Sequence, residues 1–196
     1  RTIYILPYAM PAFISLLVFR LMFNGIGPIN NMLVNFGIER IPFFTDPILA
    51  KISVLAINTW VGAPYFMVLL SGSLTNISST LYEAAEIDGA TKMQQFKHIT
   101  LPMLLFQTAP VLILSFAYNF NNFGAIYLLT DGNPVNSNLK FAGETDILVT
   151  WLYKLTVNQQ QFGMAAVISI VLFAFIATVS LYNFRKSKSF TEEDMI

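Results

Sequence analysis

The hydrophobic positions of this 196-residue chain form long unbroken runs, and its charged positions gather between the runs. Four stretches contain no Asp, Glu, Lys or Arg: residues 2–19, 52–82, 99–130 and 155–184. A helix needs about 20 mainly apolar residues to cross the hydrocarbon core of a bilayer. The last three runs exceed that length, and the first continues past Arg20 to Phe23. The pattern therefore predicts four membrane spans, near residues 3–23, 52–73, 103–128 and 163–184.

Composition supports a membrane protein. Hydrophobic residues make up 55% of the chain and charged residues 11%, whereas about 25% of a typical soluble domain is charged. A soluble protein with buried helices would need polar faces along these segments, and the runs contain none. We expect an all-α, polytopic transmembrane protein, with residues 1–196 forming a single transmembrane domain.

The start of the chain, its cysteine content and its net charge give further expectations. It begins at Arg1, inside the first expected span, so we expect it to be part of a longer protein with further N-terminal spans. It has no cysteine, which excludes disulfides and thiolate metal sites. Its net charge is zero, which gives no bulk attraction to nucleic acid. We expect no metal and no cofactor.

Two connectors between the spans contain turn signals and short helical patterns. Residues 23–47 mix Gly, Pro and Asn with apolar residues, which favours a short interfacial helix between turns. Residues 130–161 begin with the turn dipeptides Asp131-Gly132 and Asn133-Pro134. The later segment DILVTWLYKL predicts an amphipathic surface helix, with Trp151 and Tyr153 at headgroup level.

The orientation in the membrane is predicted from the end of the chain. Arg185, Lys186 and Lys188 follow the last span, and positive clusters stay cytoplasmic. The C-terminus and residues 76–100 would then be cytoplasmic, and residues 24–48 and 131–160 extracytoplasmic. Four cations would lie outside and go against the rule: Arg40, Lys51, Lys140 and Lys154.

The segment LYEAAEIDGATKMQQFKHITLPML, residues 81–104, interrupts this apolar chain with charged and titratable side chains. Thr80 and Glu83 have the spacing of a capping box for a helix that begins near Leu81. Asp88-Gly89 is a turn signal, and Gly89 can adopt the left-handed conformation that ends a helix. A second helix is expected over residues 91–99. His98, the only histidine, is expected to be a solvated surface residue because it has no partner for a catalytic or metal site.

These residues also carry a resemblance to a known family. Glu83, Ala84 and Ala85, then three residues and Gly89, followed by Phe96, Ile99 and Leu101-Pro102, resemble the EAA loop of binding-protein-dependent ABC importer permeases. The segments ILPYAMPAFISLLVFRLMFN, NTWVGAPYFM and SFAYNFNNF are similar to maltose and maltodextrin permease subunits of the MalF type.

The resemblance implies a role for the loop, here residues 78–102. Its first helix would be the coupling helix, seated in a cytoplasmic ATPase subunit, with these residues making the contact: Glu83, Ala84, Ala85, Asp88 and Gly89. It also implies a second permease subunit, two ATPase subunits, an extracytoplasmic binding protein and an oligosaccharide as partners, within membrane lipid. The alternative is an ordinary amphipathic hairpin at the membrane surface.

Two expected spans carry polar residues at helical spacing. One set is Asn58, Val61, Gly62 and Tyr65, and the other is Ser115, Tyr118, Asn119 and Asn122. Asn, Ser and Tyr supply hydrogen-bond donors and acceptors, and Tyr rings can lie against a sugar ring. The resemblance implies that these eight positions line the sugar site, with Val61 in place of the family's Leu and Tyr118 in place of its Phe. The alternative is polar contact between helices, which we prefer for Asn121.

Other functions have less support. The chain has no G-x-x-x-x-G-K-[ST] motif, no acid pair within a span and no nucleophile beside a base, so we do not expect an enzyme. A secondary sugar carrier would be expected to hold a carboxylate or His within a span, and none is present. We therefore expect a permease subunit of an ABC importer for maltodextrin-like oligosaccharides. Galacto-oligosaccharides or other glycosides are the alternative substrates, and a secondary sugar carrier is the alternative class.

Overall fold

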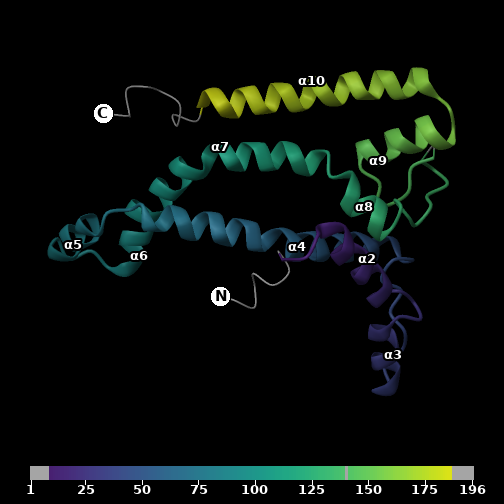
Figure 1. Ribbon diagram of the computed structural model, residues 1–196, viewed down its shortest axis with the longest axis horizontal. Coiled ribbons are helices and arrows are strands. Elements are labelled where there is room, and N and C mark those ends of the chain that lie inside the picture. The colour runs from purple at the N-terminus through teal and green to yellow at the C-terminus, as the bar shows by residue number, and fades with distance from the viewer. Residues whose placement is uncertain (1–8, 140, 187–196) are drawn as a thin grey trace. The chain divides into compact units, whose positions relative to one another are not determined.

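A computed structural model describes residues 9–139 and 141–186, and the part of the chain that it describes is helical, without strands (Figure 1). Within these described residues, three helical segments are long and apolar enough to cross a membrane: Pro47–Thr75, Lys92–Phe120 and Phe162–Arg185. The all-α membrane class predicted from the sequence is therefore confirmed.

The first expected span, residues 3–23, is described only from residue 9 onward. Among the described residues only α2 (Ala12–Met22) is helical there, and residues 3–8 lie outside the described range. Pro11 comes directly before α2, and its ring disfavours a helical conformation of the preceding residue. Eleven helical residues rise about 16 Å, roughly half the thickness of the hydrocarbon core. This helix alone is too short for the expected span.

The third expected span, residues 103–128, is divided into two helices. α7 (Leu101–Phe120) ends eight residues early, and α8 (Phe123–Leu129) follows as a separate helix. Asn122 begins α8, because its side-chain Oδ1 accepts a hydrogen bond from the backbone N–H of Ala125 at 3.3 Å. Short amide side chains compete with the helical hydrogen bonds in this way. The prediction of one continuous helix was wrong.

The chain forms two compact units. The first contains the chain up to Pro64 and residues Asn119–Phe175, and the second contains Tyr65–Tyr118 and the chain from Ile176 onward. The helices α4 (Pro47–Thr75), α7 and α10 (Phe162–Lys186) contribute residues to both units.

The first unit has a hydrophobic core where α2, α4 and α8 meet. Its buried side chains are Leu16, Val54, Ile57, Ile126 and Leu129. The guanidinium of Arg20 in α2 donates a hydrogen bond to the carbonyl of Leu128 in α8 at 3.3 Å. Apolar packing and this contact together hold α2 against α8.

The short helix expected in the first connector is present as α3 (Pro28–Asn35), with Pro28 in the first turn. Asn30, in the first turns of this helix, is fully buried. Its Nδ2 donates to the carbonyls of Asn24 at 3.1 Å and Ile41 at 3.0 Å, and its Oδ1 accepts the Ile41 N–H at 2.8 Å. One side chain thus joins the backbone before α3 to the backbone after it.

The second connector of the first unit also contains its expected helix, as α9 (Leu148–Tyr153) continued by the π-helical turn η3 (Lys154–Asn158). The Tyr153 ring packs edge-on against Phe123 and Tyr127 of α8, at centroid distances of 5.1 and 5.4 Å. Aromatic packing therefore anchors α9 to α8.

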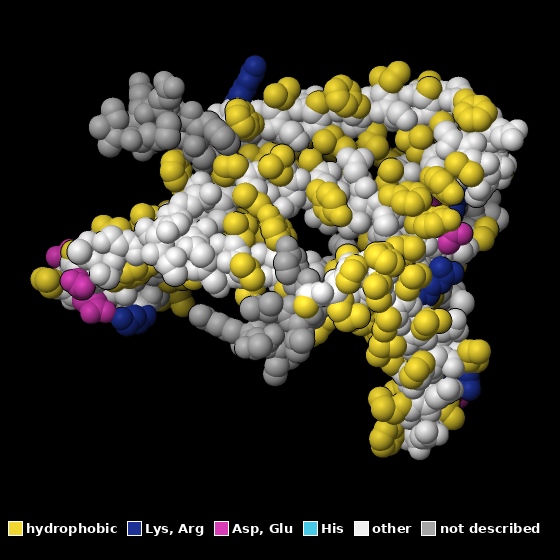
Figure 2. Space-filling view, in the orientation of Figure 1, with side chains coloured by type: hydrophobic (Ala, Val, Ile, Leu, Met, Phe, Trp, Pro, Cys, Tyr) yellow, Lys and Arg dark blue, Asp and Glu magenta, His cyan; other side chains and the backbone are white. Residues whose placement is uncertain are grey.

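The second unit contains the polar hairpin. It consists of α5 (Ser79–Ile87), α6 (Lys92–Gln95) and the π-helical turn η2 (Phe96–Thr100). On the face shown in Figure 2, charged side chains gather over α5 and α6, whereas hydrophobic side chains run along α10. This distribution matches a polar hairpin attached to apolar helices.

Two details of the hairpin correct the sequence predictions. Ser78 caps α5, because its Oγ accepts the Thr80 N–H at 3.3 Å, so the expected Thr80 and Glu83 capping box was wrong. The second helix does not end near residue 99 but continues through η2 into α7. Pro102 has no N–H to donate to the preceding turn, and a widened π-turn is a common way to accommodate an interrupted helical ladder.

Candidate functional site

Three asparagines from the two predicted polar faces meet in the first unit, and we call Asn58, Asn119 and Asn122 the amide cluster. The Asn122 Nδ2 donates to the Asn58 Oδ1 at 3.0 Å. The Asn58 Nδ2 lies 3.5 Å from the Asn119 Oδ1. Residues about 60 positions apart in the sequence are thereby joined through their side-chain amides.

The break between α7 and α8 produces this arrangement. Asn119 lies in the last turn of α7, and its carbonyl accepts the Asn122 N–H at 3.3 Å. Asn122 is therefore not on the same helix as Ser115, as the spacing had predicted, but reaches Asn58 from the start of α8. The prediction of a shared helical face was wrong for Asn122. Its side chain nevertheless contacts Asn58 of the other polar set.

The cluster presents several hydrogen-bonding groups. A side-chain amide has two N–H donors and an oxygen with two lone pairs. The 3.5 Å separation of Asn58 and Asn119 is long for a hydrogen bond, so this contact is weak. Asn58 and Asn122 are half-buried, and Asn119 is exposed. The arrangement can therefore exchange a weak amide contact for a bond to a polar ligand.

Two other predicted site residues lie in the same unit on α4. Val61 packs against the hydrophobic core of α2, α4 and α8, so part of its side chain has an apolar packing role. A Cβ built on Gly62 would meet no atom within 4 Å. The space beside Gly62 is open, as the prediction of close ligand approach requires.

The remaining predicted site residues, Tyr65, Ser115 and Tyr118, belong to the second unit. Tyr118 is 69% exposed and Tyr65 is 40% exposed, so both rings have surface available for contact. The Tyr65 ring lies edge-on to Phe66 at a centroid distance of 5.3 Å. Ser115 is half-buried on α7.

The end of α5 has the geometry predicted for Gly89. Its φ is +79°, in the left-handed region. The Ala90 N–H donates to the Ala85 carbonyl at 2.9 Å, and the Gly89 N–H donates to the Glu86 carbonyl at 3.1 Å. These two bonds form a Schellman motif, with Asp88 as the C-cap. The prediction that Gly89 ends the helix is confirmed.

Side-chain contacts hold the hairpin closed. The Tyr82 hydroxyl and the Thr100 Oγ1 form a hydrogen bond of 2.8 Å between α5 and η2. The Lys92 ammonium lies 2.5 Å from a Glu86 carboxylate oxygen. Its hydrogen bond and charge hold the pKa of Glu86 below the ordinary value. The helix surface that carries Glu83 and Ala84 is exposed, whereas Ala85 is half-buried.

Sequence reasoning missed two ion pairs in the first unit. Lys51, near the start of α4, pairs with Glu144 of the connector between α8 and α9. Lys154 pairs with Asp146 at 2.8 Å, and the Asp146 side chain is 1% exposed. In the sequence, only the opposite charges of these residues indicated such pairs. Their separation hides the pairing, because Lys51 and Glu144 are 93 residues apart. Each of these cations is compensated locally.

Comparison with known proteins identifies the family. Residues 1–188 match the family described as binding-protein-dependent transport system inner membrane component. The chain is 43% identical over 195 residues to the galactooligosaccharides transport system permease protein GanP of Bacillus subtilis (strain 168), covering 98% of this chain and 46% of that protein.

Two further relatives have comparable identity. The maltodextrin transport system permease protein MdxF of Bacillus subtilis (strain 168) is 42% identical, covering 100% of this chain and 47% of that protein. The maltose/maltodextrin transport system permease protein MalF of Vibrio vulnificus (strain YJ016) is 46% identical, covering 96% of this chain and 37% of that protein. The chain spans less than half the length of these relatives.

A solved structure shares the architecture. The chain aligns with a bacterial ABC transporter involved in the import of the acidic polysaccharide alginate, with a TM-score of 0.80 and 26% identity. The alignment covers 97% of this chain and 65% of that one. The same transporter type is also known in complex with an alginate pentasaccharide-bound periplasmic protein, at a TM-score of 0.79 and 27% identity. With a family match over almost its whole length, this chain belongs to the binding-protein-dependent transport system inner membrane components.

Proposed function

We propose that this chain is a permease subunit of an ABC importer that moves neutral oligosaccharides across the cell membrane. The amide cluster is the observation that carries the proposal, because it joins uncharged polar groups of α4 and of the α7–α8 break. Family membership and relatives named for maltodextrin, maltose and galactooligosaccharide transport support the same substrate class.

The chemistry of the eight predicted site residues favours a neutral sugar. None of them carries a charge, whereas recognition of an acidic polysaccharide favours Arg or Lys, which pair with carboxylates. The amides of Asn58, Asn119 and Asn122 would exchange hydrogen bonds with sugar hydroxyls. Tyr65 and Tyr118 would place their rings against the apolar face of a sugar. Maltodextrins and galacto-oligosaccharides, the two classes of neutral substrate, would both be bound through these hydroxyl and ring contacts.

The polar hairpin would connect the permease to ATP hydrolysis. We propose that α5, with Glu83, Ala84 and Ala85, docks in a cytoplasmic ATPase subunit and that the Gly89 turn sets the direction of α6. The proposal includes a second permease subunit, a second ATPase subunit and an extracytoplasmic binding protein. It places residues 76–100 and the C-terminus in the cytoplasm, although residues 187–196 lie outside the described range.

Substitutions in the amide cluster test the proposal, and the structure shapes their design. Asn122→Ala would also remove the cap of α8, which costs about 1 kcal/mol. Asn122→Ser keeps a capping oxygen and removes the amide donor. Asn122→Ser and Asn119→Ala should each weaken sugar uptake roughly five- to 150-fold, because losing a hydrogen-bond partner in a shielded site costs about 1–3 kcal/mol.

The assay is uptake of labelled oligosaccharide by the complete importer in proteoliposomes, beside ATP hydrolysis stimulated by the loaded binding protein. Uptake should fall while stimulated hydrolysis stays near wild type. Asn121→Ala is the matched control, since Asn121 lies between the cluster residues and was predicted to point elsewhere. Wild-type uptake by both cluster variants, or a larger loss in Asn121→Ala, would refute the sugar role and favour helix packing.

A further inference from the structure

An exposed apolar surface lies on and around α3 in the first connector. The side chains that form it are large, hydrophobic and exposed: Ile26, Met32, Val34, Phe36 and Ile38. We call these five residues the α3 patch, and Figure 2 shows hydrophobic side chains along α3. Ile26 and Phe36 are each 76% exposed. Apolar surface that is this concentrated indicates contact with another molecule or with a membrane.

The α3 patch lies next to an apolar helix that would face lipid. Leu17, Val18 and Leu21 of α2 are exposed, and α2 is an apolar helix within the first expected span. Five residues separate the end of α2 from the start of α3, and the two helices lie close together. The exposed apolar surface therefore continues from a membrane helix into the first connector, which favours lipid as its occupant.

The backbone of α3 is prepared for a position beside lipid, where unsatisfied polar groups are costly. The Gly37 N–H donates to the Val34 carbonyl at 2.9 Å. The Ile38 N–H donates to the Leu33 carbonyl, also at 2.9 Å. With a φ of +77° at Gly37, these bonds form a Schellman motif. At the start of α3, Pro28 has no N–H to satisfy. These features lower the cost of placing α3 next to acyl chains.

Arg40 is an exposed cation that the protein holds beside α3. Its guanidinium donates to the Gly25 carbonyl at 2.8 Å and to the Asn31 Oδ1 at 3.3 Å. Gly25 precedes α3 and Asn31 belongs to it, so the two bonds fix the position of the guanidinium on this segment. A guanidinium has five N–H donors, and these uncharged acceptors leave its charge without a counterion.

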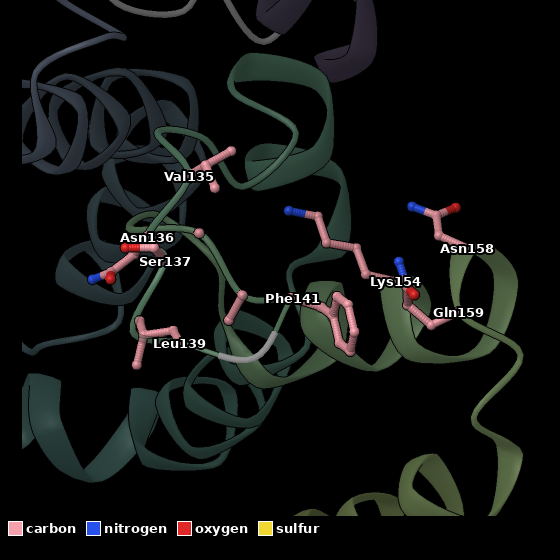
Figure 3. Close-up of a pocket in the computed structure, with 10 residues that line it drawn as sticks. Val135, Asn136, Ser137, Leu139, Phe141, Lys154, Asn158 and Gln159 are labelled. Atoms are coloured by element: carbon pink, nitrogen blue, oxygen red, sulfur yellow. The ribbon is translucent and has the colours of Figure 1, made fainter.

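Two other cations of the expected extracytoplasmic regions are compensated within the chain. Lys51 pairs with Glu144, and Lys154 pairs with Asp146 at 2.8 Å. Figure 3 shows the Lys154 side chain extending from its helical turn toward the loop that carries Val135. These two lysines need no anion from outside the chain.

Arg40 has no acidic partner in the described part of the chain, including its neighbour Glu39. The acids beyond that part are residues 192–194, which the proposed orientation places on the other side of the membrane. The planar guanidinium of Arg matches phosphate well, because it can donate two parallel hydrogen bonds. A phospholipid carries its phosphate directly beside its acyl chains, so one molecule suits both Arg40 and the α3 patch.

We propose that the first connector binds an anionic phospholipid, with the α3 patch against its acyl chains and Arg40 at its phosphate. Phosphatidylglycerol has no ammonium beside its phosphate, so Arg40 should favour it over phosphatidylcholine. The choice of the outer leaflet rests on the orientation given under the proposed function, whereas the lipid contact rests on the connector itself.

Photo-crosslinking on the complete importer tests the proposal, in nanodiscs with equal amounts of phosphatidylglycerol and phosphatidylcholine. Benzoylphenylalanine replaces the exposed aromatic residue Phe36, and mass spectrometry identifies the crosslinked molecule. The main adduct should be phospholipid, with about five-fold more phosphatidylglycerol than phosphatidylcholine, the preference that one Arg near a membrane surface supplies. The same probe at Met32 should also give lipid adducts, so the result does not depend on one position.

Substitutions of Arg40 test the phosphate contact in the importer with the probe at Phe36. Arg40→Gln should bring the ratio of the two lipid adducts close to one, and Arg40→Lys should keep most of the excess because it keeps the charge. Lys51→Gln is the matched control, since Glu144 already compensates this cation, and its ratio should stay within two-fold of wild type. An unchanged ratio in Arg40→Gln, or an equal loss in Lys51→Gln, would overturn the proposal.

The identity of the adduct separates lipid from a protein partner. Crosslinks from both Met32 and Phe36 to the binding protein or the second permease, in place of lipid, would show a protein-docking surface and overturn the proposal. Uptake measurements separate the proposal from the proposed function. Normal oligosaccharide uptake without lipid adducts would refute the lipid site alone. Lipid adducts with the expected ratio in an importer that transports no oligosaccharide would support the lipid site and refute the proposed function.

Discussion

Gly89 offers a quantitative test of the coupling hairpin. Its φ of +79° lies in the left-handed region, and a Cβ at this position would meet no atom within 4 Å. A substitution therefore introduces no clash, and its cost comes from the backbone alone. That cost is about 1–2 kcal/mol for an L-residue, and a β-branched Val should be at or above the upper end.

A cost of this size would depopulate the closed turn roughly five- to 30-fold. We therefore expect Gly89→Val to lose most sugar-stimulated ATP hydrolysis and uptake, because the direction of α5 relative to α6 is no longer fixed. Membrane insertion should persist, since the long apolar helices are unaffected. Gly89→Asn is the matched control, because Asn tolerates the left-handed conformation.

The assay compares three quantities for each variant: the amount in the membrane, the amount of ATPase subunit that co-purifies, and the rate of sugar uptake. Gly89→Asn should remain close to wild type, and Gly89→Val should retain its membrane level while losing co-purification or uptake. Wild-type uptake by Gly89→Val would show that the turn has no coupling role. Equal loss in both variants would show that the backbone argument is wrong.

The remaining predictions concern topology, an ion pair and the sugar contact. A single cysteine at position 92 should resist an impermeant reagent in intact cells and one at position 138 should react; the opposite result would reverse the orientation. Lys51 lowers the pKa of Glu144 by hydrogen bonding, so this contribution to stability is complete above the ordinary pKa of 4.5 and is lost as the pH falls below it. Thermal unfolding of Lys51→Ala should therefore occur at a lower temperature than that of wild type at pH 7, and the two should converge in acid; a constant difference would exclude the pair as the cause. Tyr118→Ala should reduce uptake at least as much as Asn119→Ala, and an unchanged uptake rate would exclude the ring from the sugar site.

The membrane helices were predictable because the solvent imposes a simple rule. A bilayer demands apolar helices of a minimum length, so the charge-free runs around residues 52–73 and 163–184 located α4 and α10 directly. The Gly89 turn was also predictable, because only a few residue types adopt a positive φ readily. In these cases a local or solvent constraint determines the result.

The break at Asn122 could not be predicted in the same way. Apolar residues continue on both sides of it, and an Asn within a helical pattern can either remain helical or cap a new helix. The contact with Asn58 and the packing of α8 in the core are tertiary features that favour the second outcome. The choice of Ser78 over Thr80 as the cap of α5 was a similar competition between two suitable residues.

The ion pairs show a different limit of prediction from the sequence. Lys51 and Lys154 were visible as cations that went against the expected orientation, but their partners could not be assigned without the fold. Buried Asn30, which joins two turns of the first connector, likewise has no sequence pattern that separates it from Asn31. Contacts between distant or irregular segments depend on the whole chain.

A cryo-EM structure of the complete importer with a bound neutral oligosaccharide tests the central claim most directly. The account predicts sugar density within hydrogen-bonding distance of Asn119 and Asn122, with the 3.5 Å contact between Asn58 and Asn119 replaced by bonds to sugar hydroxyls. Sugar density at another position in the spans, with the three amides still paired to one another, would contradict it.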